Sequence, residues 1–223
     1  MRSLKFAAAA VLLAVPAIPL AADDHAEAET PSAYFTGADL FNLTVATDPQ
    51  ISPDGRKIAY VRMANDIMTD SAVRSIWLVD VASGAETPLV AGAGAHFSPR
   101  WSPDGTRLAY ISTMSGGGPE LHVRWMDSGA SANITALPEG PGGISWSPDG
   151  SQIADTARVP GKPVSLGSAP AKPEGAEWKA PPSITDAVTY RFDGGGYLKP
   201  GFTQIFVVSA KGGAARQLTS GDR

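Results

Sequence analysis

The sequence predicts an all-β fold: a β-propeller of four-stranded blades, with about three blades present in an incomplete ring. The first observation is a repeated twelve-residue frame that begins at Pro49, Pro99 and Ile144. Repeats of about 40 to 50 residues that hold several short strands are typical of propeller blades. The second observation is a turn-rich composition, with 24 glycines and 19 prolines among 223 residues. Because closed propellers have about four to eight blades, we expect three units to form part of a ring.

Each frame contains the tetrapeptide Ser-Pro-Asp-Gly. It stands at Ser52, Pro53, Asp54 and Gly55, at Ser102, Pro103, Asp104 and Gly105, and at Ser147, Pro148, Asp149 and Gly150. Proline pre-sets φ for the second position of a type I turn, and aspartate suits the third position. Glycine accepts the left-handed conformation that a three-residue hairpin loop with a bulge requires. We therefore predict that each tetrapeptide is a structural turn between two antiparallel strands.

Four strands are predicted in each unit. The first strand ends just before the turn, and short apolar runs of strand type follow at 57–63, 107–112 and 152–154. A third strand is expected at 75–81, 121–126 and 203–208, and a weaker fourth at 87–90, 133–137 and 216–219. The predicted blades cover about residues 45–95, 96–142 and 143–220, within a partial propeller that spans 36–223.

Residues 1–22 are predicted to be a signal peptide. Arg2 and Lys5 form a basic start, and an apolar run of 15 residues leads from Phe6 to Leu20 before Ala22. This run is too short for a membrane-spanning helix. A retained anchor is the alternative, because Leu20 is not the small residue preferred near a cleavage site. We expect export, to the periplasm if the source is a Gram-negative bacterium and otherwise by secretion, with no membrane contact after cleavage.

The segment between the signal and the first frame has two parts. Residues 23–35 are small and polar, so we expect a disordered linker. After it, the run from Thr36 to Asp39 resembles a capping box and predicts a short helix that carries Leu40, Phe41 and Leu43. This helix is expected to pack under the first blade.

The net charge argues against two kinds of partner, and the lack of cysteine excludes disulfides. The formal net charge is −4; without Arg2 and Lys5, 16 basic residues face 22 acidic residues, which gives −6. An acidic chain argues against nucleic acid or an anionic membrane as a partner. The sequence has no cysteine, so disulfides do not contribute to its stability.

No cofactor or metal is expected. The three histidines, His25, His96 and His122, are dispersed and no cysteine accompanies them, so a metal site is not predicted. The triple glycine at 194–196 does not open a helix after a strand, so it is not a phosphate-binding loop. Each histidine is interpreted as structural or solvated rather than as a general base.

An insertion interrupts the third blade at about residues 156–202. Six prolines lie between Val159 and Pro182, and this density favours an extended, mobile excursion. Loops held by a rigid scaffold are where binding residues concentrate. A binding loop and a simple solvated loop are equally open interpretations of the insertion.

The segments 48–62, 76–84, 190–198, 204–213 and 216–219 resemble the N-terminal propeller of the prolyl oligopeptidase family. They are most similar to the acylaminoacyl-peptidase branch, and the resemblance covers about residues 36–220. It implies an enzyme whose propeller filters peptide substrates for a C-terminal α/β-hydrolase domain with a Ser-Asp-His triad. From the matching insertion, the resemblance implies a substrate-gating role for Arg191, Asp193 and Tyr197.

The sequence departs from this family where catalysis is concerned. A hydrolase nucleophile needs a Gly-x-Ser-x-Gly elbow, and the nearest approach is Gly143-Ile-Ser-Trp-Ser147 in a predicted strand. No catalytic residue is therefore assigned, and we expect this chain to be inactive alone. The glutamate pair of the dipeptidyl-peptidase branch is not evident either.

Two other classes of function stay open. A non-enzymatic periplasmic propeller similar to TolB would bind proteins, but such proteins place a small α/β domain before the propeller. The first frame here begins at residue 49, which leaves no room for that domain after the signal. An inhibitor or decoy is the third interpretation.

Overall fold

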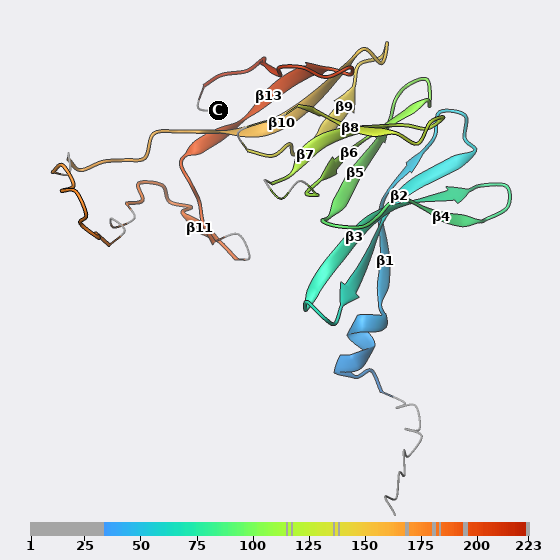
Figure 1. Cartoon of the computed structure of the whole chain (residues 1–223), viewed down its shortest axis with the longest axis horizontal. Helices are drawn as coiled ribbons and strands as arrows, with labels where there is room; N and C mark the ends of the chain where they lie inside the picture. The colour runs from blue at the N-terminus through green and yellow to red at the C-terminus, as the bar shows by residue number, and fades with distance from the viewer. Residues whose placement is uncertain are drawn as a thin grey trace, which may run out of the picture. The chain divides into compact units, whose positions relative to one another are not determined.

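The computed structural model describes residues 34–221, except 115, 117, 136, 138, 168, 169, 180, 181, 183, 194 and 195. The predicted signal peptide and all but the last two residues of the predicted linker lie outside the described residues. The chain divides into the units Met1–Thr36 and Gly37–Arg223, and every strand belongs to the second unit. This unit contains three four-stranded antiparallel sheets and one two-stranded hairpin (Figure 1).

The strands of each sheet follow one another in space as they do along the chain. The first sheet contains β1 (Thr44–Ile51), β2 (Lys57–Asp66), β3 (Ser71–Asp80) and β4 (Glu86–Val90). The second contains β5 (His96–Trp101), β6 (Arg107–Ser112), β7 (Glu120–Trp125) and β8 (Ser131–Thr135), and the third contains β9 (Ile144–Trp146), β10 (Gln152–Pro160), β13 (Gly201–Ser209) and β14 (Arg216–Gln217). This is the blade pattern of a propeller. The predicted all-β fold of about three four-stranded units is confirmed.

One strand and the predicted helix differ most from the sequence prediction. Strand β10 was expected to end at Ala154 but continues to Pro160, because it pairs with β13 over its whole length. The first residues of the predicted insertion therefore belong to the sheet. The predicted helix is a 3-10 helix, η1 (Gly37–Asn42), with no buried residue. It lies beside β2, where Asn65 Nδ2 donates to Leu40 O at 2.8 Å, so it adds little to the apolar core.

The three Ser-Pro-Asp-Gly turns have one geometry. The glycines Gly55, Gly105 and Gly150 have φ of 72°, 69° and 67°, which is the predicted left-handed conformation. The predicted loop length is wrong, because four residues, not three, lie between the closing residues Ser52 and Lys57. The reason lies in the hydrogen bonds: Ser52 O accepts from Gly55 N, so Lys57 N donates instead to Ser52 Oγ at 2.9 Å.

Serine and aspartate lock this turn through their side chains. In the second turn the Ser102 hydroxyl donates to Asp104 Oδ1 at 2.5 Å and accepts from Arg107 N at 2.9 Å. The hydrogen bond from Ser102 is the main reason that the pKa of Asp104 is lowered to about 2. The same pair, Ser147 and Asp149, lowers the pKa of Asp149 to about 2. The aspartate therefore stays ionised and holds the turn over the physiological pH range.

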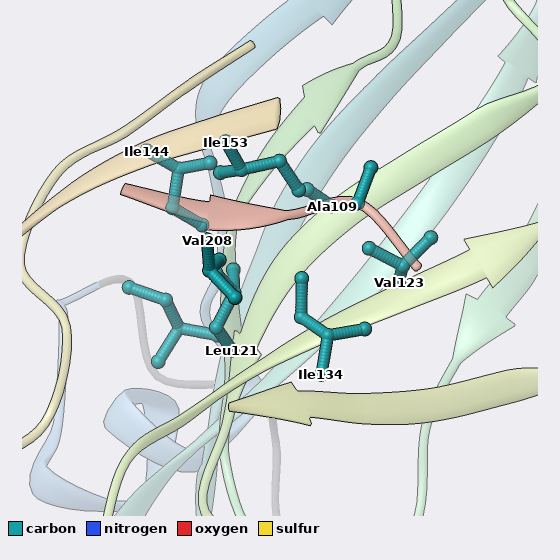
Figure 2. Packing of buried hydrophobic residues seen from close by; sticks show 9 residues of the cluster. Ala109, Leu121, Val123, Ile134, Ile144, Ile153 and Val208 are labelled. Atoms are coloured by element: carbon teal, nitrogen blue, oxygen red, sulfur yellow. The ribbon is translucent and has the colours of Figure 1, made fainter. Parts of the chain in front are cut away.

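Two apolar clusters join the sheets at two seams. The first seam, between the first and second sheets, contains Ala59, Ile76, Leu78, Leu108 and Tyr110. The second seam, between the second and third sheets, contains Ala109, Ile111, Leu121, Val123, Ile134, Ile144, Ile153, Val208 and Ala210 (Figure 2). Side chains alternate between the two faces of a strand, so neighbours in β6 serve different seams. The second sheet is consequently buried on both faces.

The same polar contact fastens both seams. The Trp101 indole donates to Gln50 O at 3.0 Å, and the Trp146 indole donates to Arg100 O at 2.9 Å. In both cases the tryptophan before one turn binds a carbonyl of the preceding sheet. At the first seam Arg100 Nη1 also forms an ion pair with Asp48 at 2.8 Å. The repeated frame therefore specifies contacts between sheets as well as the hairpins within them.

Candidate functional site

A small hairpin stands in the insertion between β10 and β13. Its strands are β11 (Arg191–Phe192) and β12 (Gly196–Tyr197), and Arg191 lies opposite Tyr197. Leu198 N donates to Tyr190 O at 2.8 Å and extends the pairing. Gly196 has φ of 71°, a conformation that favours glycine. This glycine therefore suits the start of the second strand of the hairpin.

Aromatic rings gather on this hairpin. The ring centroids of Tyr190 and Tyr197 are 6.2 Å apart with an interplanar angle of 30°, and Arg191 Cζ lies 5.9 Å from the Tyr197 centroid. Such distances allow ring stacking and a cation–π contact. The side chains remain open to solvent, since Tyr190 is 48% exposed, Phe192 58% and Tyr197 64%. The three rings therefore form an exposed aromatic cluster on the insertion.

The charges beside the rings are also exposed. Arg191 and Asp193 take part in none of the ion pairs found among the described residues. A guanidinium can donate to a peptide carbonyl or carboxylate, and a carboxylate can accept from an amine. The structure thus brings the predicted residues Arg191 and Tyr197 into contact and places Asp193 at the adjoining turn. Sequence reasoning missed Tyr190 and Phe192, although aromatic residues at 190 and 192 beside a run of glycines were a signal for them.

The base of the insertion is held firmly at the third sheet. Gly161 N donates to Pro200 O at 3.0 Å, and the Arg158 guanidinium donates to Lys199 O. Gly201 has φ of 134°, and a Cβ atom there would lie 2.3 Å from Val159 O. Only glycine fits that close approach. The two ends of the insertion, at residues 161 and 200, therefore lie side by side where they leave the sheet.

A hollow of about 540 Å³ lies at the turn end of the second seam. It is lined by Asp104, Thr106, Arg107, Trp125, Met126, Asp127, Ala210 and Lys211. The Arg107 guanidinium is already engaged there: it donates to Gly150 O at 2.9 Å and lies 4.8 Å from the Trp146 ring centroid. The lining contains no serine, cysteine or histidine. Its one hydroxyl, Thr106 Oγ1, donates to Asp104 Oδ2 at 2.8 Å as part of the turn.

Buried histidines lie at the first seam. The rings of His96 and His122 flank Tyr110 at centroid distances of 6.4 and 5.5 Å. Burial lowers the pKa of both imidazoles. Ser112 Oγ lies 3.0 Å from His96 Nδ1, which is the distance expected of a nucleophile and its base. Because Ser112 and His96 are both buried, no substrate can reach this pair.

A buried carboxyl on β10 was missed by the sequence reasoning. Asp155 is 2% exposed, and burial raises its pKa to about 6. The signal was present in the repeat: the first two frames end in Tyr60 and Tyr110, whereas the third ends in Asp155. A charged residue at an apolar position of a repeat indicates either a partner or a perturbed pKa.

The described part of the chain offers neither a candidate cluster of metal ligands nor a candidate membrane-spanning helix. Among these residues no group of three or more His, Asp or Glu side chains could hold a metal ion. Within the same described ranges, no helix is long and apolar enough to cross a membrane.

Comparison with known proteins agrees with the fold and with the family resemblance. Residues 41–165 match the family model of the TolB β-propeller domain. The uncharacterized peptidase YuxL of Bacillus subtilis is 33% identical over 190 residues, which cover 83% of this chain and 28% of YuxL. Dipeptidyl-peptidase 5 of Porphyromonas endodontalis is 27% identical over 153 residues, which cover 68% of this chain and 22% of that peptidase.

A solved structure shows the same fold. Acylaminoacyl peptidase from Pyrococcus horikoshii superposes with a TM-score of 0.57 and 15% identity, over 77% of this chain and 24% of that protein. The chain thus spans less than a third of the length of these relatives. Its three four-stranded sheets, its repeated turns and the match over residues 41–165 show that the chain belongs to the TolB β-propeller domain family, with peptidases among its relatives.

Proposed function

We propose that this chain is the substrate-gating propeller portion of an exported serine peptidase of the prolyl oligopeptidase type, close to the acylaminoacyl peptidases. The observation that carries the proposal is the 33% identity to the peptidase YuxL over 83% of this chain. The matched region makes up 28% of YuxL. The remaining length of such a relative has room for a catalytic α/β-hydrolase domain, which is the proposed partner. The sequence of this chain has no Gly-x-Ser-x-Gly elbow.

The insertion hairpin is the proposed gating element. It stands on the third sheet, whose strands fix the base of the insertion through Gly161, Pro200 and Gly201. Binding residues on a loop with a rigid base can select ligands without loss of position. The Tyr197 ring offers a flat apolar face, and Arg191 offers hydrogen-bond donors to the carbonyl or carboxylate oxygens of a peptide. Asp193 would accept from a peptide amine.

In this role the hairpin acts on binding and leaves the chemistry to the hydrolase. Because the sequence of this chain has no Gly-x-Ser-x-Gly elbow, the proposal assigns acyl transfer to groups of the hydrolase domain. No cofactor is part of the proposal. Export is proposed from the basic start and apolar run of residues 2–20.

The test compares variants of the complete peptidase. Arg191→Ala and Tyr197→Ala should each raise KM for peptide substrates by about tenfold, which corresponds to about 1.4 kcal/mol. The kcat for a small acyl ester should not change, because the ester does not reach the hairpin. Arg74→Ala is the matched control, since Arg74 is an exposed arginine on β3 of the first sheet. The gating role would be refuted if a hairpin variant impaired hydrolysis of the ester as much as hydrolysis of the peptide. It would also be refuted if Arg74→Ala raised KM for the peptide as much as the hairpin variants do.

A protein-binding role like that of TolB is the second candidate. The observation in its favour is the family model itself, which covers residues 41–165. That match ends before the hairpin at 190–198. The family model therefore supports the propeller, whereas the hairpin is an argument for the peptidase proposal alone. If the complete protein binds a protein partner but hydrolyses no acylated or peptide substrate, the second candidate is preferred.

A further inference from the structure

Asp155 lies in the apolar seam between the second and third sheets. On β10 the residues Ile153, Asp155 and Ala157 alternate with less buried neighbours and share one face. Ile153 belongs to the cluster that joins the two sheets (Figure 2), so Asp155 faces the same seam. Both of its carboxylate oxygens are buried and have no hydrogen-bond partner among the described residues. An unpaired charge in such a place is costly.

The repeat shows what normally occupies this position. In the first two frames the matching residues are Tyr60 and Tyr110. Tyr110 is buried and fills the first seam together with Leu108. A tyrosine stays neutral below about pH 10, so it fits an apolar seam at any ordinary pH. The third frame substitutes a group that ionises with an ordinary pKa of 3.8.

The surroundings of Asp155 offer no compensating charge. Its neighbours in the ladder are Ile144 on β9 and Phe206 on β13. Gln204 is also buried on β13, but its side-chain amide already has partners. Its Oε1 accepts from Thr219 Oγ1 and its Nε2 donates to Gly221 O. On the facing sheet, β6 and β7 present the side chains of the apolar cluster, and Thr135 on β8 has a buried hydroxyl.

Charged groups of this seam gather at its turn end. Those found among the described residues are Arg107 on β6 and, in the turns, Asp104, Asp127 and Lys211. Arg107 is bound to Gly150 O. None of the four contributes to the raised pKa of Asp155, of which burial is the single cause. The pKa of the Asp155 carboxyl therefore depends on whether the seam is closed over it.

We propose that Asp155 is a pH-sensitive latch of the seam between the second and third sheets: the seam closes over the neutral carboxylic acid and loosens when the proton passes to water. The sign is set by the raised pKa. Stability from this group is fully present below pH 3.8 and is lost as the pH rises through about 6. Because β10 leads directly into the insertion, loosening of the seam changes how firmly the hairpin at 190–198 is held. The latch does not depend on the peptidase proposal.

Hydrogen exchange of the whole protein, followed by mass spectrometry from pH 4 to 7.5, tests the latch. After correction for the intrinsic pH dependence of exchange, protection of amides in β9 and β10 should fall up to about 100-fold over this range, because the two pKa values differ by about two units. Asp155→Asn should remove that dependence. Asp186→Asn is the matched control: it removes an exposed carboxylate in the insertion and should behave like the wild type.

A second variant protects the test against a folding defect. Asp155→Tyr restores the residue of the other two frames, and it should also give protection that does not change with pH. A carboxyl titration of Asp155 by NMR should have its midpoint near pH 6. A midpoint near 4, wild-type protection that does not change with pH, or the same pH dependence in Asp155→Asn would overturn the proposal.

Discussion

Replacement of Trp146 by phenylalanine tests whether the repeated frame holds the sheets together. The change keeps an aromatic ring at the second seam but removes the indole N–H that donates to Arg100 O at 2.9 Å. Loss of that hydrogen bond costs about 1 kcal/mol. A weaker contact with the Arg107 guanidinium, which lies 4.8 Å from the Trp146 ring centroid, adds about 0.5 kcal/mol. The smaller ring also buries less apolar surface, which adds roughly 0.5 kcal/mol.

We therefore expect the free energy of unfolding to fall by about 2 kcal/mol, or the Tm by about 4 to 8 °C for a chain of this size. Urea and thermal unfolding followed by circular dichroism provide the measurement. Trp101→Phe should give a similar loss, because Trp101 makes the same contact at the first seam. Trp178→Phe is the control, since Trp178 is exposed in the insertion. A loss below about 0.5 kcal/mol at Trp146, or one equal to that of the control, would refute this role of the indole.

Four further predictions concern the turn, the insertion, activity and processing. Ser102→Ala should raise the pH at which acid unfolding begins, because the lowered pKa of Asp104 contributes stability above pH 3.8 that is lost as the pH falls toward 2, and its main cause is Ser102; acid titration followed by circular dichroism measures the shift. Gly201→Ala should cost at least about 2 kcal/mol in urea unfolding, since its Cβ would lie 2.3 Å from Val159 O; a loss under about 0.5 kcal/mol would show that the strands move apart easily. The 223-residue chain should not hydrolyse acylated aminoacyl or short peptide substrates, and turnover that a serine-directed inhibitor abolishes would contradict this. Intact-mass analysis of the exported protein should show cleavage near Ala22; a product that retains residue 1 would instead indicate an anchor.

The candidate site could be predicted only in part. The resemblance drew attention to Arg191 and Tyr197, and the structure places the guanidinium over the ring. Sequence reasoning did not find that Tyr190 stacks on Tyr197, because that pairing depends on the register of the hairpin. It also passed over Asp155, although the third frame differs from the others there. Burial of a single position depends on which sheet packs against it, and one strand does not contain that information.

The sequence by itself determined the local architecture of this protein. Proline, aspartate and glycine at fixed places in each frame specify a turn whatever lies around it, and apolar runs beside the turn specify the strands. The tertiary structure decided what the frames do to one another. It joined Arg100 to Asp48 across the first seam and directed the indoles of Trp101 and Trp146 to carbonyls of the preceding sheets. Periodicity is a property of neighbouring residues, whereas a seam forms between residues about 50 positions apart. Only the folded chain therefore shows which polar groups find hydrogen-bond partners at a seam. It also shows that Asp155 is buried there without a partner among the described residues.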